Sequence, residues 1–369
     1  MISSFAFPTQ ILHGVGSLDE LPARLEQLSI LRPLVVTDKG LLETDALALL
    51  CAVLPATTEI FSGVHPNPIE ADVEAGAEAW HTGKCDGVIG FGGGSALDVA
   101  KILRAAVAPM GKPWRELVWS DHPGKLPPFV AIPTTAGTGS EVGRSSVITS
   151  GKTKRVIFHP ALLAQLVILD PRLTTGLPAK LTAATGIDAL THCIESFTSP
   201  TFHPLCDAIA LEGARIAFQN LAQAVEHGDD LTARGMMQIA AAMGGIAFQK
   251  DLGAAHSLSH PLSAHFGLNH GLANGLCLPA VMHFNAKRKP GLYDRIGVAA
   301  GIGNNDAAVI GATERLLSRI GISGGLRGQG VTETALESLS EAAFADGCHA
   351  TNPVPVTKAD LLELYRRAL

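Results

Sequence analysis

Two kinds of hydrophobic pattern alternate along the first half of the chain. Short apolar, β-branched runs predict buried strands at residues 34–38, 57–61, 87–91 and 129–132. Longer amphipathic runs predict helices at residues 41–54 and 71–81, and a further helix begins near Ala96. Strands and helices in alternation are typical of a parallel α/β sheet, so the first half is predicted to be an α/β domain.

The pattern changes near residue 178, where strand-like runs end and helical periodicity takes over. Helices are predicted at residues 207–225, 231–248, 306–320 and 332–344. The chain is therefore predicted to have two domains, an α/β domain at residues 1–178 and an all-α domain at residues 179–369.

Composition narrows the class of protein. The 369 residues carry a net charge of −6 with no basic run, which argues against nucleic acid or an anionic membrane as a partner. The six cysteines form no CxxC pair, as expected of reduced thiols, and the first residues do not have the pattern of a signal peptide. We expect a soluble, cytoplasmic enzyme.

A glycine-rich turn follows the strand at residues 87–91. Gly93, Gly94 and Ser95 lie just before the predicted helix, where a glycine backbone and a helix N-terminus together favour a phosphate group. A cofactor pyrophosphate fits this position. The GxGxxG fingerprint is not met, because Ser95 stands in place of its third glycine, and a tight strand-to-helix turn without a ligand is the alternative.

A second polar segment, PTTAGTGSEVGRSSVIT at residues 133–149, follows the strand at residues 129–132. Parallel α/β sheets bind ligands at the carboxyl ends of their strands, where this hydroxyl-rich loop is predicted to lie. A surface loop of turn-forming residues is the alternative. Two such segments in one sheet favour a ligand site.

Residues 252–286 contain no Asp, Glu, Lys or Arg but include five of the fourteen histidines. His256 and His260 are four residues apart and share a helix face, and His270 opens a second segment after a break at Phe266 and Gly267. Neutral imidazole is a common ligand of zinc and iron. Each histidine taken alone is explained better by an ordinary hydrogen bond near a helix end, so the hypothesis of a metal site depends on the rest of the chain.

A carboxylate joins this set from the start of the helical half. In GIDALTHCIES, Asp188 and His192 lie at i and i+4, on one helix face. Such a pair is often only a solvated ion pair. With the histidines of residues 252–286 it completes a candidate metal site of one carboxylate and three histidines.

The sequence resembles the metal-dependent, iron-containing (group III) alcohol dehydrogenases along nearly its whole length. The motifs that carry the resemblance are HGVGSLDELP, VVTDKG, HPNP, FGGGSALDVAK, PTTAGTGSEV, LDP, GIDALTHCIES, the histidine-rich stretch and a late NP. The resemblance implies a Rossmann-like nucleotide domain, an all-helical metal-binding and catalytic domain, and between them NAD(P) and one divalent metal, Fe²⁺ or Zn²⁺. We also expect a homodimer or a higher homo-oligomer.

The resemblance also implies roles for single residues. The metal ligands would be Asp188, His192, His256 and His270. His260 would be a catalytic neighbour of the nicotinamide and not a ligand. The cofactor would contact Asp38, Gly93, Gly94, Ser95, Thr134, Thr135, Thr138, Ser140 and Lys154. Because the Asp38 carboxylate would accept hydrogen bonds from the ribose and repel a 2′-phosphate, we expect NAD in preference to NADP.

The reaction expected from the resemblance is hydride transfer between a nicotinamide and a small alcohol or aldehyde. Arg144, Lys250 and Cys348 are the candidate substrate residues. A buried cation needs a compensating anion, so Arg144 and Lys250 suggest an acid-bearing semialdehyde. The alternative is that both cations face solvent or pair with Glu141 and Asp251.

Two other functions remain open from the sequence. One is a lyase like dehydroquinate synthase, which uses NAD and a metal without net oxidation, although its metal site tends to carry one Glu and two His. The other is a catalytically silent nucleotide-binding protein, which would be expected to have a damaged metal set.

Overall fold

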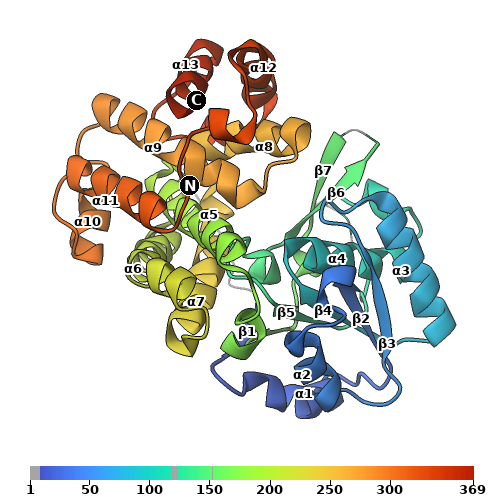
Figure 1. Cartoon of the computed structure of the whole chain (residues 1–369). Coiled ribbons are helices and arrows are strands. Elements are labelled where there is room, and N and C mark those ends of the chain that lie inside the picture. Colours follow the sequence, from blue (N-terminus) through green and yellow to red (C-terminus); the bar gives the residue numbers. More distant parts are fainter. Residues whose placement is uncertain (1–8, 119–120, 122–123, 152) are drawn as a thin grey trace. The chain divides into compact units, whose positions relative to one another are not determined.

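A computed structural model describes residues 9–118, 121, 124–151 and 153–369; the side chains of residues 153 and 154 are left out of the description. The chain divides into two compact units. The first contains residues 1–135 and 139–177, and the second contains residues 136–138 and 178–369. Figure 1 follows the chain from the blue strands and helices of the first unit to the red helices at its C-terminus.

The first unit is built on a parallel sheet of six strands in the order β1-β8-β5-β4-β2-β3. Its strands are β1 (Gln10–His13), β2 (Pro33–Asp38), β3 (Glu59–Val64), β4 (Gly87–Gly92), β5 (Phe129–Pro133) and β8 (Leu166–Leu169). Every residue of β4 and β5 is buried, as expected of central strands covered on both faces. The helices of this unit are α1 (Leu21–Gln27), α2 (Asp45–Val53), α3 (Glu70–Gly83) and α4 (Gly94–Val107).

The order of the strands creates a switch point. From β2 the chain moves outward to β3, and from β4 it moves in the opposite direction to β5. The switch therefore lies between the neighbouring strands β2 and β4, which pair in parallel with Val36 opposite Gly90. Open α/β sheets bind ligands outside the carboxyl ends of the strands at such a point. Asp38 ends β2 and the glycine-rich turn follows β4, so both lie there.

One part of the sequence prediction for this unit is wrong. Residues 133–149 were expected to form a loop, but their last part belongs to β6 (Ser145–Ser150), which pairs antiparallel with β7 (Thr153–Phe158). The hairpin is separate from the parallel sheet. Its polar, serine-rich sequence gives little of the apolar alternation by which strands are recognised.

The second unit is helical. Its helices are α5 (Ala179–Thr198), α6 (Pro204–Glu226), α7 (Leu231–Ala247), α8 (Ala254–Phe266), α9 (His270–Arg288), α10 (Asp294–Ala300), α11 (Asp306–Arg319), α12 (Leu336–Ala345) and α13 (Lys358–Ala368). The predicted break after Phe266 is confirmed, since α8 ends there and Gly267 has a left-handed conformation with φ of 67°. The predicted fold class, an α/β sheet followed by a helical half, is confirmed.

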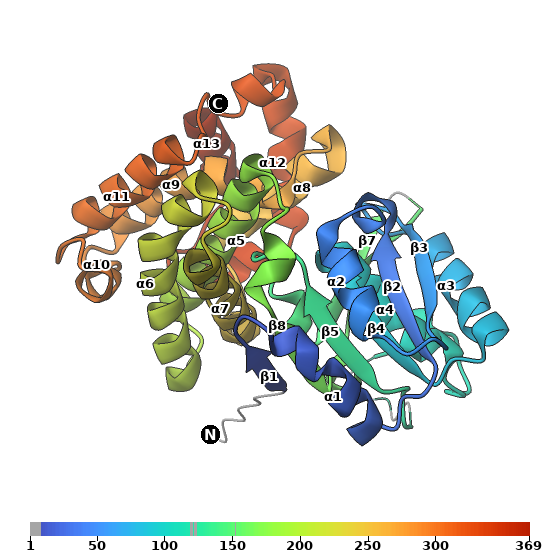
Figure 2. The same ribbon diagram turned by 60° about the horizontal axis from the view of Figure 1, so that its bottom comes forward.

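Helix α5 is the central element of this unit. It packs against α6, α7 and α9, and Figure 2 shows it running among them. Fifteen of its twenty residues are buried, including Asp188, His192 and Glu195. A helix that is buried on nearly all sides places its polar residues in the interior, where they need partners. Among the described residues, no helix is long and apolar enough to cross a membrane.

Candidate metal centre

The structure brings the four predicted ligands together within the second unit. Asp188 and His192 lie on α5, His256 lies in the first turn of α8, and His270 is the first residue of α9. The Nε2 atoms of His192, His256 and His270 lie 3.9, 3.8 and 3.7 Å from Asp188 Oδ1. Tetrahedral ligands about 2.1 Å from a zinc ion are roughly 3.4 Å apart. Asp188, His256 and His270 have ligand atoms within 4.8 Å of one another, whereas His192 approaches Asp188 but is not part of this closer set.

A close approach of two helices places His270 beside Asp188. Gly271 packs so tightly against α5 that a Cβ atom there would lie 1.9 Å from the Ala184 carbonyl oxygen. Only glycine fits this contact, and it holds the N-terminus of α9 against the Asp188 turn of α5. The glycine of the NHG motif is therefore explained by packing.

The electrostatics of the four side chains suit a cation. Burial lowers the pKa of His256 and of His270 well below the usual value, so both rings are neutral and offer a lone pair. Burial alone would raise the pKa of Asp188, but the positive charge that a proton on His192, His270 or His256 would bring, together with the hydrogen bond from Asn274, lowers it. A buried anion faced by neutral imidazoles leaves one negative charge for a bound cation to compensate.

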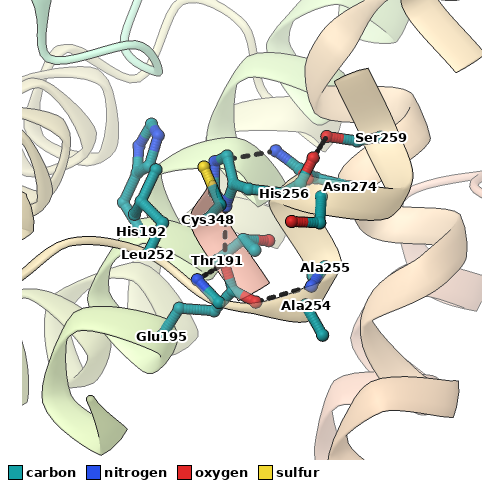
Figure 3. Close-up of polar contacts among 12 residues, drawn as sticks. Thr191, His192, Glu195, Leu252, Ala254, Ala255, His256, Ser259, Asn274 and Cys348 are labelled. Carbon is teal, nitrogen blue, oxygen red and sulfur yellow. Dashed lines mark hydrogen bonds and ion pairs between the residues drawn. The ribbon is translucent and has the colours of Figure 1, made fainter. Parts of the chain in front are cut away.

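Glu195 orients His256 from the side away from Asp188. Its carboxylate accepts hydrogen bonds from His256 Nδ1 at 2.6 Å and from the N–H groups of Ala255 at 2.7 Å and Gly253 at 3.0 Å. Figure 3 shows Glu195 between the His256 ring and the start of α8. Because Nδ1 carries the hydrogen, the lone pair of His256 is on Nε2, directed at Asp188.

Asn274 lies among the four side chains, and hydrogen-bond acceptors outnumber donors around its amide nitrogen. Its Nδ2 lies 2.7 Å from Asp188 Oδ1, 3.1 Å from His256 Nε2 and 3.3 Å from His270 Nε2. An amide nitrogen has two hydrogens, so it cannot satisfy all three. The buried Nδ1 of His192 and Oδ1 of Asn274 also have no hydrogen-bond partner in the described chain. Several lone pairs thus converge where donors are too few, which is the arrangement that a divalent cation fits.

His260 lies next to this group but faces another carboxylate. Its ring stacks on His270 with centroids 5.2 Å apart, and its Nδ1 donates to Asp346 Oδ2 at 2.7 Å. Cys348 lies beside this pair: its thiol sulfur, a ring nitrogen of His260 and a carboxylate oxygen of Asp346 are within 4.8 Å of one another. Burial raises the pKa of Cys348 far above that of a free thiol, which keeps it protonated and poorly nucleophilic.

In the first unit, the two predicted cofactor segments lie side by side. Gly92 pairs with Pro133 in the sheet, and Thr134 donates its N–H to the Gly92 carbonyl at 3.0 Å. Helix α4 begins at Gly94 and no side chain caps it, so the first N–H groups of the helix remain available to an anion. A Cβ atom on Gly93 would touch only Thr135, at 3.6 Å, which leaves room above the turn.

Asp38 and Ser95 border this turn. Asp38 Oδ1 accepts the Gly40 N–H at 2.8 Å, and its other oxygen lies 3.6 Å from where a Gly92 Cβ would stand. The Ser95 hydroxyl donates to the Pro66 carbonyl at 2.6 Å and so ties the turn to the HPNP loop. One oxygen of Asp38 therefore has a structural partner while the other faces the turn.

Ser140 has a different environment from the one expected of a cofactor contact. It is buried, donates to Asp98 at 2.6 Å and accepts from Lys101 Nζ at 2.7 Å. Lys101 itself is fully buried and also donates to the Ser145 carbonyl. This network joins α4 to the hydroxyl-rich segment. Thr135 and Thr138 are partly buried, and the side chain of Lys154 lies outside the described residues.

The two candidate substrate cations have protein partners. Lys250 is 2% exposed and forms an ion pair with Asp207, not with Asp251 as the sequence alternative named. Its charge is therefore already compensated. The Arg144 guanidinium lies over the Phe158 ring, 5.3 Å from its centroid. Glu141 is buried near Lys101, and its burial raises its pKa to about 7.

Three residues of the site were missed from the sequence. Glu195 stands seven residues after Asp188 on the same helix, and Asn274 stands four after His270, so helical spacing contained a signal for both. Asp346 is 86 residues away from His260, and no local pattern links them.

Comparison with known proteins identifies relatives over the whole chain. A family described as iron-containing alcohol dehydrogenase matches residues 8–171, and its C-terminal part matches residues 182–369. The 4-hydroxybutyrate dehydrogenase of Cupriavidus necator is 37% identical, with 98% of this chain and 97% of that protein covered. The resemblance seen in the sequence motifs is thereby confirmed.

Solved structures agree with the sequence relatives. A 1,3-propanediol oxidoreductase is 35% identical with a TM-score of 0.94, and all of both chains is covered. A sulfoacetaldehyde reductase from Bifidobacterium kashiwanohense, solved with NAD⁺, is 31% identical with a TM-score of 0.91, covering 100% of this chain and 99% of that one.

Proposed function

Because the chain belongs to the iron-containing alcohol dehydrogenase family, we propose that it is an NAD-dependent and divalent-metal-dependent dehydrogenase of a short, acid-bearing alcohol. Members of this family are alcohol dehydrogenases, so the chain is an oxidoreductase. In the reverse direction it would reduce the corresponding semialdehyde.

One observation carries the metal part of the proposal. Asp188 and neutral histidines direct more lone pairs at one point than the Asn274 amide has hydrogens to satisfy. Asp188, His192, His256 and His270 would hold the metal, with Glu195 fixing the His256 ring. A divalent cation bound there supplies Lewis acidity toward an alcohol or carbonyl oxygen. Three nitrogen ligands and one oxygen suit either Fe²⁺ or Zn²⁺.

The predicted domain at residues 1–178 would hold the cofactor, and the predicted domain at residues 179–369 would hold the metal. The uncapped start of α4 at Gly93, Gly94 and Ser95 would bind the pyrophosphate, whose charge the helix N-terminus favours. Thr134, Thr135 and Thr138 would line the inner half of the cofactor, and Lys154 would reach its ribose. Ser140 would support the cofactor site without contacting the cofactor, since its hydroxyl is hydrogen-bonded to Asp98 and Lys101.

Asp38 supports NAD over NADP. Its position at the end of β2, beside the switch point, is where a carboxylate meets the adenosine ribose in dinucleotide-binding folds. A 2′-phosphate at the same place would be repelled by the carboxylate.

His260 would exchange the proton of the alcohol. Its Nδ1–H is held by Asp346, so Nε2 is the ring nitrogen that can accept a proton from a hydroxyl group or return it. Cys348 lies beside it as a protonated thiol and would contribute only a wall of the substrate pocket.

The acid-bearing substrate is supported by two relatives and one side chain. The names of the 4-hydroxybutyrate dehydrogenase and the sulfoacetaldehyde reductase both denote anionic substrates. Arg144 offers a planar guanidinium suited to bidentate capture of a carboxylate or sulfonate. Lys250 would have no substrate role, since Asp207 neutralises it.

A paired-substrate assay tests this proposal. NADH consumption is measured with succinic semialdehyde and with butanal, for the wild type, Arg144→Ala and the control Arg155→Ala, an exposed arginine of the hairpin that follows Arg144. Arg144→Ala should lose about 2 kcal/mol, or roughly thirtyfold in kcat/KM, for the acid alone. Equal losses for both aldehydes would assign Arg144 a structural role.

A neutral diol is the second candidate substrate. It is favoured by the solved 1,3-propanediol oxidoreductase, whose fold matches this chain with a TM-score of 0.94. A wild type that prefers 3-hydroxypropanal to succinic semialdehyde would select this candidate and reject the acid-bearing one.

A further inference from the structure

Two carboxylates hold two histidines of α8 in the same way. Glu195 accepts from Nδ1 of His256 at 2.6 Å, and Asp346 accepts from Nδ1 of His260 at 2.7 Å, one helical turn later. In both rings the hydrogen is therefore on Nδ1 and the lone pair is on Nε2. Glu195 acts on a proposed metal ligand, whereas the partner of Asp346 is the neighbouring histidine.

Asp346 is itself firmly anchored. Its Oδ1 accepts the Ser257 hydroxyl at 2.9 Å and the Cys348 N–H at 2.9 Å, while its Oδ2 accepts from His260 Nδ1 at 2.7 Å. The two oxygens thus have separate tasks. Oδ1 fixes the carboxylate to α8 and to the turn that begins at Cys348, and Oδ2 fixes the His260 ring.

We propose that Asp346 is a positioning residue. It holds His260 in the tautomer whose Nε2 carries no hydrogen, and it keeps the His260 ring stacked on the ring of His270. The proposal rests on the catalytic role proposed for His260 and deepens it. The planes of the His260 and His270 rings are 15° apart. Asp346 therefore holds the His260 ring nearly parallel to the ring of a proposed metal ligand.

A second metal site is the competing explanation for His260, Asp346 and Cys348, since all three residues carry ligand atoms. The His260–Asp346 distance argues against it. Two ligands of one tetrahedral metal stand roughly 3.4 Å apart, whereas these atoms are 2.7 Å apart, the length of a charge-assisted hydrogen bond.

The anchoring of Asp346 makes Asp346→Asn an unusually specific test. The Ser257 hydroxyl and the Cys348 N–H both donate to the Oδ1 position, so they hold the amide oxygen there. The amide NH₂ then faces Nδ1 of His260 and needs it as an acceptor. The ring is driven to the opposite tautomer, with hydrogen on Nε2, while the side chain keeps its size.

The experiment measures kcat, KM, bound metal and NADH affinity for the wild type, Asp346→Asn, His260→Ala and the double variant. Asp306→Asn is the matched control, because Asp306 also organises a loop of the helical unit, through the N–H groups of Gly291 and Tyr293. Asp346→Asn should lower kcat by about tenfold or more, with metal content and NADH affinity kept. In the His260→Ala background the same substitution should change kcat by less than about twofold.

The outcomes separate this inference from the proposed function. An Asp346→Asn effect as large without His260 as with it, or a loss of bound metal, would make Asp346 a structural or metal-binding residue and overturn the inference alone. Unchanged kcat in Asp346→Asn would do the same. A wild type that transfers no hydride to any aldehyde would overturn the proposed function, and the role of Asp346 with it.

Discussion

Glu195 accepts a hydrogen bond from His256 Nδ1 at 2.6 Å, and it also accepts the N–H groups of Gly253 and Ala255 at the start of α8. One buried carboxylate thus fixes both a helix end and the ring of a proposed metal ligand. A Cβ atom on Gly253 would lie 2.7 Å from Glu195 Oε1, so the α8 terminus closes directly onto this side chain. Carboxylates in this position orient ligands and raise their basicity.

Glu195→Gln is therefore expected to weaken metal binding by about 10- to 100-fold, because an amide cannot serve His256 Nδ1 and both N–H groups as a carboxylate does. Competition with a fluorescent chelator measures the affinity. Glu212→Gln, which removes a carboxylate paired with Arg215 on α6, is the control and should bind metal as the wild type does. Equal metal affinity in Glu195→Gln and the wild type would show that the hydrogen bond does not support the ligand.

The turn after β4 contains two glycines with different roles. Gly92 is required by the backbone conformation, and Gly93 is a proposed cofactor contact. Gly92 has φ of 145°, and its Cβ would lie 2.9 Å from that of Ala96, so Gly92→Ala should destabilise the fold by about 1–3 kcal/mol. Gly93→Ala has room, yet the methyl group projects where the pyrophosphate is proposed. We expect it to keep Tm and to weaken NADH binding about tenfold, which is about 1.4 kcal/mol. Unchanged NADH affinity in Gly93→Ala would show that the pyrophosphate does not bind at this turn.

The charge of Asp38 can be removed while its turn is kept. In Asp38→Asn the amide oxygen still accepts the Gly40 N–H, whereas Asp38→Gly removes both charge and hydrogen bond. Both variants should narrow the preference for NAD over NADP by about tenfold, since repulsion of the 2′-phosphate is lost. Ratios of kcat/KM for the two cofactors measure the change. Equal use of NADP by the wild type would contradict this account of Asp38.

Asp170 links stability to pH in the first unit. It is fully buried and accepts from Gly16, Leu18 and Arg172. Burial alone would raise the pKa of Asp170, but the hydrogen bonds from Arg172 and Leu18 and the charge of Arg172 lower it below the usual value. The stabilisation is therefore complete at neutral pH and is lost as pH falls through the lowered folded-state value.

Asp170→Asn should accordingly be less stable than the wild type by roughly 2 kcal/mol at pH 7. The gap should stay constant down to about pH 5 and shrink below about pH 4, where the unfolded carboxyl takes up a proton. Denaturant unfolding at several pH values measures it. A stability difference between the wild type and Asp170→Asn that grows in acid would contradict this account of the ion pair.

The sequence predicted the features that depend on local pattern. Buried strands such as β4, the glycine turn and the i, i+4 pairs Asp188/His192 and His256/His260 all follow from spacing within one element. The β6–β7 hairpin was missed because its segments SSVITS and TKRVIF lack the apolar alternation by which strands are recognised. The role of Asp346 depends on a contact across 86 residues, which folding creates and which no spacing reveals.

The partner of Lys250 shows the same limit. The sequence offered Asp251, the next residue, as the possible ion-pair partner of Lys250. Asp251 has a positive φ of 65°, and Lys250 instead forms its ion pair with Asp207 on α6. Which charge neutralises a buried cation is decided by helix packing, and helix packing was not available from the pattern of α7 and α8 alone.

Metal dependence of hydride transfer tests the central claim most directly. The protein is stripped with a chelator, then titrated anaerobically with Fe²⁺ or Zn²⁺ while NADH oxidation by an aldehyde and bound metal are followed together. The account predicts no turnover in the stripped protein and recovery that saturates at one metal per chain, with neither in His256→Ala. Full turnover by wild-type protein that holds no metal would contradict it.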